Sequence, residues 1–290
     1  MIAKLRLLSK NWLPPIVQEM RNSFRAWLKF RTSDKKELLN KNSVLKNTAR
    51  GKRAFLIATG PSLKMEDLSA LAGEDCYGIS NFFLHEHIRS INPKFHFFAP
   101  YHEPVTLESY VEWLVKADQT LPPETNIFME AEMADLAGKY KLFPKRKIFY
   151  LHFSRYPAAD KVDITKPILV PQTGPLMALP VLLYMGYREI YLLGCDHTEL
   201  RDYKKTISNF FDPSQDIRKT TPTAKNVRYD VWYDGIINNL RNTLSVFEQY
   251  MFYRNLLRDS DVKIVNLSRD SWLDFFAMDT LKNVIDKKQI

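Results

Sequence analysis

Residues 176–196 read LMALPVLLYMGYREIYLLGCD, and this stretch decides the fold class. Leu176–Tyr184 is apolar almost all round, which predicts a buried helix, and Gly186 is placed to cap its C-terminus. The segment Tyr187–Gly194 then predicts a buried strand that ends in Cys195-Asp196-His197. A helix, a capping glycine and a buried strand in this order are typical of an α/β fold.

A second buried strand is predicted near the start of the folded body. Ala54–Ala58 is a short apolar run, and Thr59-Gly60-Pro61-Ser62-Leu63 follows it directly. Gly60 permits close backbone approach, and Pro61 with Ser62 can open a helix whose amides and dipole face a phosphate. The turn is therefore a candidate phosphate site, although Gly-Pro-Ser also serves merely to turn the chain. It is neither a P-loop nor the three-glycine dinucleotide motif.

Further short apolar runs extend the predicted sheet. The additional predicted strands are Cys76–Ser80, Phe95–Ala99, Ile127–Met129, Ile148–Leu151 and Val262–Leu267. Helices are predicted over Glu130–Tyr140 and from Gly235 to about Arg258. Together these elements predict a Rossmann-like, mostly parallel sheet flanked by helices, in a domain that spans residues 53–290.

Polar side chains follow two of these strands. Asn81 comes after the strand at Cys76–Ser80, and Tyr101, His102 and Glu103 come after the strand at Phe95–Ala99. Because ligands of open parallel sheets bind at the carboxyl ends of the strands, these residues are candidates for ligand contact. The alternatives are that Asn81 caps a helix and that His102 is an ordinary surface histidine.

The segment from about 199 to 234 has no apolar period and is crowded with charged, threonine, proline and aromatic residues. Such a long irregular stretch predicts a mobile lid over a site.

The N-terminal 53 residues carry 14 Lys or Arg against Glu19, Asp34 and Glu37, a balance of +11, whereas the other 237 residues sum to −2. Apolar residues recur at helical spacing after Pro14-Pro15 and predict an amphipathic helix. These residues are Ile16, Met20, Phe24, Trp27 and Leu28. Lys35–Arg53 is polar and lacks such a period, which predicts a connector, so residues 1–52 form a basic arm outside the domain.

The arm has two main interpretations. Trp12, Phe24, Trp27 and Phe30 beside many cations suit the headgroup level of an anionic membrane, which residues 1–34 would contact. Alternatively, the apolar stripe packs on the body with its charges in water. Nucleic acid would also require a basic face, but nothing in the body resembles a nucleic-acid module, so no nucleic-acid partner is expected.

Composition excludes several classes of protein. The chain has 290 residues, of which 45% are hydrophobic, and is long enough to bury a core. Cys76 and Cys195 have no partners at metal-ligand spacing and form no disulfide framework, which fits a reducing compartment. No apolar run approaches the roughly 18 residues of a membrane span, and no secretory signal is present, so a cytoplasmic location is expected.

No metal site is expected either. The only Asp-x-Asp is Asp259-Ser260-Asp261, which precedes the last predicted strand at its amino end. Because that is the wrong side of the sheet for a nucleotide crevice, the motif is interpreted as a turn.

Four motifs in order resemble the bacterial sialyltransferases of glycosyltransferase family 42. They are Thr59-Gly60-Pro61-Ser62-Leu63, Ser80-Asn81-Phe82-Phe83, Gln172-Thr173-Gly174 and Gly186–Asp196, and Lys263–Ser268 with Trp272-Leu273 also matches. The match covers roughly residues 52–280. The same frame is similar to the broader domain-of-unknown-function-115 group, which includes flagellin glycosyltransferases and an archaeal 6-hydroxymethylpterin diphosphokinase.

The resemblance implies a sugar donor activated by cytidine monophosphate (CMP) and used without a metal or other cofactor. Thr59, Gly60, Pro61 and Ser62 would line the donor phosphate and ribose, and Asn81 would bond the donor. Gln172-Thr173-Gly174 would meet the sugar carboxylate or the base, and Asp196 would lie at the base or ribose.

The chain departs from the family pattern at two positions and in its lid. Thr59 stands where the family has Asn, and Thr198 stands where it has a tyrosine, so Tyr203, Tyr229 or Tyr233 would contact the leaving phosphate instead. The family's catalytic histidine lies in the lid, but residues 199–260 contain no histidine. The candidates for the base are therefore His197, His102 and Asp234, in that order.

The leading hypothesis is a glycosyltransferase that adds a sialic-acid-like sugar to a glycan or glycolipid at the cytoplasmic face of the cell membrane, where the basic arm would hold it. The first alternative is pyrophosphoryl transfer to a pterin, which should need Mg²⁺ and more carboxylates than Asp196 and Glu103. The second is a non-catalytic nucleotide-binding scaffold of a polysaccharide assembly complex. A homo-oligomer is compatible with each of them.

Overall fold

A computed structural model describes residues 14–157, 162–203, 209–220 and 236–287. One sheet of eight strands runs in the order β10-β9-β8-β1-β2-β3-β4-β5, with every neighbouring pair parallel. The strands are β1 (Arg53–Ile57), β2 (Cys76–Ile79), β3 (Phe95–Phe97), β4 (Asn126–Glu130), β5 (Ile148–Leu151), β8 (Glu189–Leu193), β9 (Lys263–Asn266) and β10 (Ala277–Met278). The predicted α/β fold with a mostly parallel sheet is confirmed.

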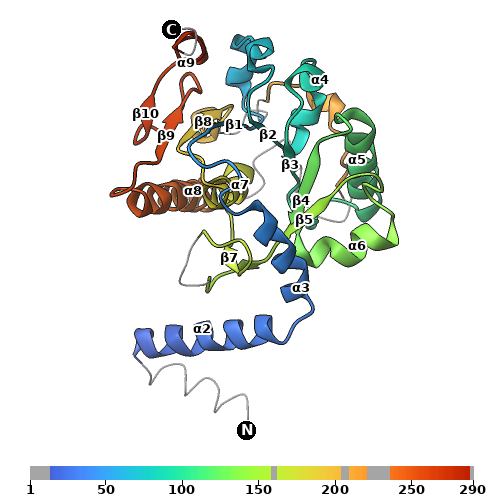
Figure 1. The fold of residues 1–290 in the computed structure, drawn as a ribbon, viewed down its shortest axis with the longest axis vertical. Helices are drawn as coiled ribbons and strands as arrows, with labels where there is room; N and C mark the ends of the chain where they lie inside the picture. Colours follow the sequence, from blue (N-terminus) through green and yellow to red (C-terminus); the bar gives the residue numbers. More distant parts are fainter. Residues whose placement is uncertain (1–13, 158–161, 204–208, 221–235, 288–290) are drawn as a thin grey trace.

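Helices lie on both faces of this sheet (Figure 1). The α-helices are α2 (Pro15–Arg31), α3 (Lys35–Asn40), α4 (Ile88–Ile91), α5 (Leu107–Thr120), α6 (Ala134–Lys139), α7 (Gly174–Met185), α8 (Ile236–Leu256) and α9 (Leu281–Asp286). Short 3₁₀ helices are η1 (Lys41–Leu45), η2 (Pro61–Met65), η3 (Leu68–Leu71), η4 (Ser80–Leu84), η5 (Ala131–Met133), η6 (Glu199–Asp202) and η7 (Pro213–Gln215). Two further strands, β6 (Phe153–Ser154) and β7 (Ile168–Leu169), pair with each other in parallel.

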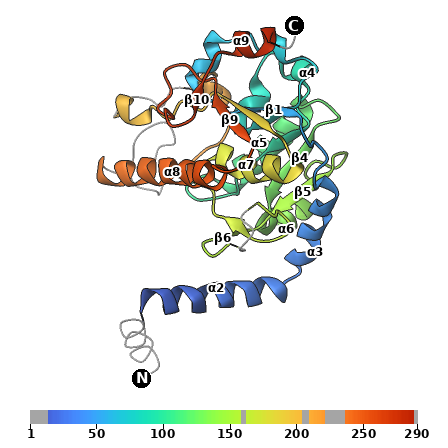
Figure 2. The ribbon, with the colours of Figure 1, turned by 60° about the vertical axis from the view of Figure 1, so that its left-hand side comes forward.

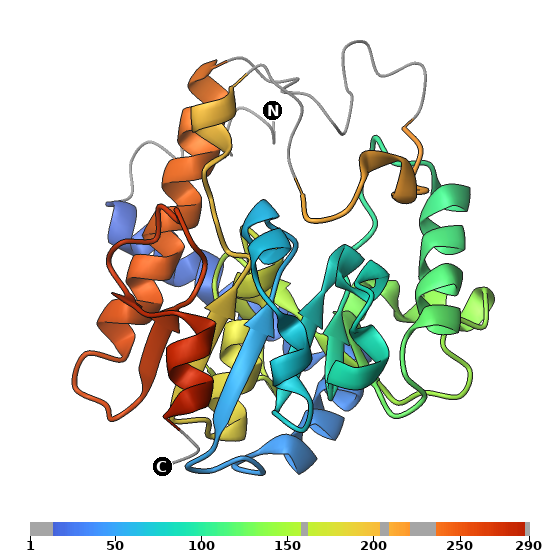
Figure 3. The same cartoon turned by 90° about the horizontal axis from the view of Figure 1, so that it is seen from above.

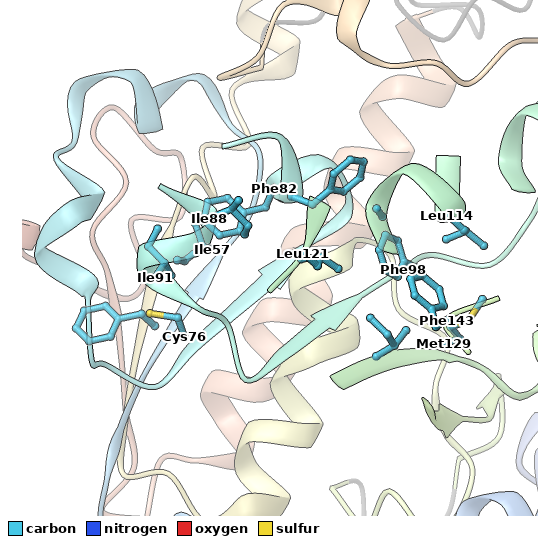
Figure 4. Packing of buried hydrophobic residues seen from close by; sticks show 14 of the residues in the cluster. Ile57, Cys76, Phe82, Ile88, Ile91, Phe98, Leu114, Leu121, Met129 and Phe143 are labelled. Atoms are coloured by element: carbon cyan, nitrogen blue, oxygen red, sulfur yellow. The ribbon is translucent and has the colours of Figure 1, made fainter. Parts of the chain in front are cut away.

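The alternation along β1 divides the core into two layers. Phe55 and Ile57 pack with residues of α4, α5 and α6, and part of this layer is drawn in Figure 4. Ala54 and Leu56 pack with residues of α7 and α8 on the other face. Because side chains of a strand point alternately to the two faces, a continuous apolar run is what a strand covered on both sides requires.

Helix α7 matches the prediction from residues 176–196. Nearly all of its side chains are buried, as expected for a helix that is apolar all round. The chain then leaves the helix at Gly186, whose φ of 88° is in the left-handed region that glycine adopts without strain. The strand that follows, β8, lies beside β1, so the helix and strand place the Asp196 loop next to the Thr59 turn.

The predicted connector is wrong for much of Lys35–Arg53. Lys35–Asn40 and Lys41–Leu45 form α3 and η1, and Leu39 is fully buried. Asn42 is also fully buried, and its Nδ2 donates to the carbonyl oxygens of Tyr150 and Ile164, both at 2.8 Å. A segment without an apolar period is therefore held in the body by two buried leucines, Leu39 and Leu45, and by the two hydrogen bonds that the Asn42 side chain donates.

Helix α2 confirms the predicted helix after Pro14. It projects from the body beyond α3, as two views show (Figures 1 and 2). Among the described residues, no helix combines the length and apolar character that crossing a bilayer requires.

The predicted strands and the long C-terminal helix are confirmed within one or two residues at most ends. The helix predicted over Glu130–Tyr140 is η5 followed by the shorter α6, and the elements α4, α5, β6, β7, β10 and α9 were not predicted. Of the segment predicted as a lid, 199–203 and 209–220 are described, and η6 and η7 lie on the side toward which the strand arrows point in Figure 3. Residues 204–208 and 221–234 lie outside the described residues.

Candidate functional site

The order in which the chain adds strands to the sheet reverses between β1 and β8. From β1 the chain proceeds to β2, β3, β4 and β5 on one side, whereas β8, β9 and β10 lie on the other. Loops that leave β1 and β8 at their carboxyl ends therefore diverge to opposite faces, and a crevice opens between them. A cavity of about 440 Å³ lies at this point, a size common for small-molecule sites.

Several residues predicted from widely separated motifs line this cavity. They are Thr59, Gly60, Pro61, Thr173, Gly174, Asp196 and His197. The first three come from the turn after β1, the next two from the N-terminus of α7, and the last two from the loop after β8. The fold thus brings the three motifs together around one space.

The turn after β1 and the loop after β8 are joined by hydrogen bonds. The Ser62 amide donates to Asp196 Oδ2 at 3.0 Å, and the Gly60 amide donates to the Gly194 carbonyl oxygen at 2.9 Å. A Cβ on Gly60 would lie 2.1 Å from Asp196 Oδ2 and 2.5 Å from the Gly194 oxygen. Glycine is required at residue 60 because these two groups fill the space beside it.

The prediction that Ser62 offers a free helix amide to a phosphate is wrong. The segment Pro61–Met65 is only a short 3₁₀ helix, and the Asp196 carboxylate already accepts from the Ser62 amide. A carboxylate of the chain itself therefore occupies the position in which an external anion was expected. Ser62 is not on the cavity wall but supports it through Asp196.

Asp196 is almost fully buried, with 5% of its surface exposed. Burial raises the pKa of its carboxyl group above the ordinary value, and the contact with Ser62 opposes that shift only in part. Among the described residues, Asp196 Oδ1, Ser62 Oγ and Thr173 Oγ1 are buried without a hydrogen-bond partner. Because a buried polar atom without a partner loses its hydrogen bond to water, these three atoms are available to a bound ligand or water, as are similar atoms elsewhere in the described residues.

His197 lies on the cavity wall with a left-handed backbone, at a φ of 50°. Its Nε2 is 3.1 Å from the hydroxyl oxygen of Tyr250 on α8. Burial lowers the pKa of the His197 imidazole to about 4, so the ring is neutral at pH 7. A neutral ring can accept a proton, but one with so low a pKa does so weakly.

The cavity wall includes functional groups that the sequence analysis missed. Arg201 and Glu199 belong to η6, the first turn of the segment predicted as a lid, and both line the cavity with Asn209 and Ser80. Desolvation raises the pKa of the Glu199 carboxyl group, although the residue as a whole is exposed. The sequence did offer a signal for Glu199 and Arg201. They follow Asp196-His197 directly, and residues next to a site residue in the chain commonly lie on the wall of the same cavity.

Asn81 is not on the cavity wall, contrary to the prediction that it would bond a donor. It is 1% exposed, its Nδ2 donates to Asp216 Oδ2 at 2.9 Å, and its Oδ1 accepts from Trp113 Nε1 at 2.5 Å. Both ends of the amide are thus used within the protein. Asn81 fixes the 212–218 segment to α5, and its neighbour Ser80 lines the cavity instead.

Four other candidates also lie off the wall. His102 is exposed, with Nδ1 3.1 Å from the Glu103 carbonyl oxygen, and neither residue nor Tyr101 lines the cavity. Gln172 is exposed, and its amide donates to Gln249 Oε1 at 2.8 Å. The β3 loop and the residue before α7 therefore turn away from the cavity.

The tyrosines and the aspartate predicted in the lid are tested only in part. Tyr203 is partly buried and lies outside the cavity lining, whereas Tyr229, Tyr233 and Asp234 lie outside the described residues. Within the described ranges, no group of three or more His, Cys, Asp or Glu side chains could hold a metal ion. The Asp259–Asp261 motif lies in a turn before β9, as predicted, and Asp261 pairs with Arg188.

Taken together, the wall offers one guanidinium group, two carboxylates, a neutral imidazole and hydroxyl groups. The remaining lining includes the apolar side chains of Ile79, Phe97 and Met177. Such a surface can hold a ligand that is partly anionic and partly flat or apolar, and it places proton acceptors beside that ligand.

No protein-family model matches the chain, and no curated protein matches it. Solved structures with a similar arrangement include the sialyltransferase CstII from Campylobacter jejuni in complex with the substrate analogue CMP-3FNeuAc (17% identity, 78% of this chain and 85% of that chain, TM-score 0.41). Others are CST-II with a trisaccharide acceptor and CMP (19%, 78% and 85%, TM-score 0.43) and the monofunctional alpha-2,3-sialyltransferase Cst-I from Campylobacter jejuni (18%, 78% and 79%, TM-score 0.44). A likeness of this extent carries no information about ligand or reaction.

Proposed function

We propose that the protein is a glycosyltransferase that moves a sialic-acid-like sugar from a CMP-activated donor to a glycan or glycolipid acceptor. One observation carries the proposal. Three of the motifs that resemble glycosyltransferase family 42 in sequence, at Thr59–Pro61, Thr173-Gly174 and Asp196, meet at one cavity, although more than a hundred residues separate the first motif from the other two. That cavity lies where nucleotides bind in open parallel sheets.

The chemistry of the wall fits an activated sugar. Arg201 supplies a permanent positive charge for the donor phosphate, a role for which the planar guanidinium is well suited. The apolar side chains of Ile79, Phe97 and Met177 offer a surface for the flat base or for a sugar face.

In the proposed reaction the bond between the anomeric carbon and the phosphate oxygen breaks, and CMP departs with the electron pair. The acceptor hydroxyl oxygen forms the new bond to the same carbon, and its proton passes to a base of the enzyme. Arg201 would stabilise the charge that develops on the phosphate, and the proposal requires no metal.

Two side chains on the wall are candidates for the base. His197 is the candidate from the sequence, but its pKa of about 4 makes it a weak acceptor at pH 7. The pKa of Glu199 is instead raised toward the working range. Turnover across the pH range and donor affinity are compared between Glu199→Gln and His197→Asn. Removal of the base abolishes turnover without lowering donor affinity, so the variant with this pattern identifies the base.

The decisive experiment is calorimetric titration of the protein with CMP, uridine monophosphate and ATP, each with and without Mg²⁺. We expect CMP to bind without Mg²⁺ and Arg201→Ala to weaken it at least tenfold, whereas Arg89→Ala, at an exposed arginine of α4, leaves it unchanged. Binding of ATP alone, and only with Mg²⁺, would replace the proposal with pyrophosphoryl transfer. CMP binding without turnover of a CMP-sugar on added glycans would favour the scaffold hypothesis.

A further inference from the structure

The polar side of helix α2 faces the domain that contains the sheet. The partly buried residues of the helix are Gln18, Arg21, Asn22, Ser23 and Ala26. The large apolar residues are exposed instead, with Ile16 at 67%, Met20 at 68% and Phe24 at 61%. Since successive residues turn by about 100° around a helix, these two sets lie on nearly opposite faces.

Contacts at the middle and at the C-terminal end of α2 fix this orientation. Asn22 Nδ2 donates to the Tyr156 hydroxyl at 3.0 Å, and Phe30 is buried against His152 with ring centroids 5.6 Å apart. The apolar stripe faces away from both contacts. The interpretation in which the stripe packs on the body is therefore wrong.

The exposed face forms an aromatic and cationic patch. Phe24 and Trp27 stack with ring centroids 5.7 Å apart, and the Arg31 guanidinium lies 5.1 Å from the Trp27 ring centroid. Arg25 and Lys29 are exposed as well, but the rotation of the helix places them toward the side of Asn22 rather than among these rings. Helix α2 has four Lys or Arg and only Glu19 as an acid. A contiguous apolar patch of this kind on a surface marks an interaction site.

We propose that this outward face of α2 docks on an anionic lipid bilayer. The helix would lie in the membrane surface with Phe24 and Trp27 at the headgroup level and with Arg31 beside lipid phosphates. The proposal is independent of the reaction in the cavity.

The charge decides between a bilayer and a second copy of the chain. The first 53 residues carry a net charge of +11, so pairing two arms would bring like charges together. An anionic bilayer gains attraction from each cation while it receives the same apolar side chains. A cationic, aromatic and outward-facing helix therefore fits lipid better than it fits its own copy.

Flotation of the full-length protein with vesicles tests this proposal. The vesicles contain phosphatidylcholine alone or with about 30% phosphatidylglycerol. We expect binding at least tenfold stronger to the anionic vesicles, with most of it lost at 0.5 M NaCl. The double variant Phe24→Ser with Trp27→Ser should lose this binding, because its wild-type side chains are exposed and their removal leaves the core intact.

The matched control is Val44→Ser with Met278→Ser, at two exposed apolar residues outside α2. We expect it to bind vesicles as the wild type does. Equal binding by the Phe24 and Trp27 variant, or no binding by the wild type, would refute the proposal. A wild-type dimer that this variant converts to a monomer, without any lipid binding, would assign the face to a second copy instead.

Discussion

The Ser62 amide nitrogen lies 3.0 Å from Asp196 Oδ2 and donates a hydrogen bond to it. This contact joins residues 134 positions apart and ties the turn after β1 to the loop after β8. Because both segments line the cavity, the Asp196 side chain holds two parts of the wall together. Its acceptor oxygen matters for this role, whereas its negative charge does not.

Replacing Asp196 separates these two properties. Asp196→Asn keeps an oxygen for the Ser62 amide and removes a buried charge, so we expect unchanged or higher stability. Asp196→Ala leaves the amide unpaired and should cost about 1–3 kcal/mol. Urea unfolding at pH 7 measures both. Equal destabilisation by the two variants would mean that the hydrogen bond is not what holds the two segments together.

Replacing Gly60 is a second test of the contact between the turn after β1 and the loop after β8. An alanine Cβ would lie 2.1 Å from Asp196 Oδ2 and 2.5 Å from the Gly194 carbonyl oxygen, so the turn or the loop after β8 would have to move. We expect Gly60→Ala to cost about 1–3 kcal/mol and to weaken nucleotide binding. The control is Gly138→Ala in α6, where nothing lies within 4 Å of the added Cβ. That variant should unfold at the same or a slightly higher urea concentration.

The sheet could be predicted because each of its buried strands is a continuous apolar run, as at Ala54–Ala58. Helix α3 could not, since one buried residue, Leu39, creates no period. In α5, by contrast, Tyr110, Trp113, Leu114 and Ala117 recur at helical spacing and were a usable signal.

The same contrast applies to the site. Which turns meet at the cavity follows from the sheet, because all carboxyl ends of parallel strands share one edge. Which side chain of a turn faces the cavity does not follow from local sequence. Asn81 turns away since Trp113 and Asp216, both distant in the chain, bind its amide.

Asn81→Ala should therefore affect the fold more than the ligand. The change leaves the buried Trp113 N–H without an acceptor and removes one hydrogen bond from Asp216, which keeps its pairing with Arg218, at a cost of about 1–3 kcal/mol. We expect CMP affinity at 10 °C to stay within about threefold of the wild type, because the Asn81 side chain does not line the cavity. Calorimetry and urea unfolding of the same preparation measure both quantities. If the variant has wild-type stability but no longer binds CMP, Asn81 contacts the donor, contrary to this expectation.

His96 makes stability sensitive to acid. It is fully buried, its Nε2–H donates to the Ser80 carbonyl oxygen at 2.7 Å, and its Nδ1 has no partner among the described residues. Burial lowers the pKa of the imidazole from 6.5 to about 4. Between these values the unfolded chain binds a proton that the folded chain does not, so stability falls as the pH falls from 6.5 to 4. The loss from this one group is about 3 kcal/mol.

The variant His96→Gln retains a side-chain donor for Ser80 and does not titrate in this range. We expect its free energy of unfolding to be lower than that of the wild type at pH 7, with the difference shrinking by about 3 kcal/mol by pH 4. Urea unfolding at pH 7, 5.5 and 4.5 follows the trend, and His102→Gln, at an exposed histidine, controls for the loss of a histidine as such. Parallel pH profiles for the wild type and His96→Gln would show that His96 takes up its proton equally in both states.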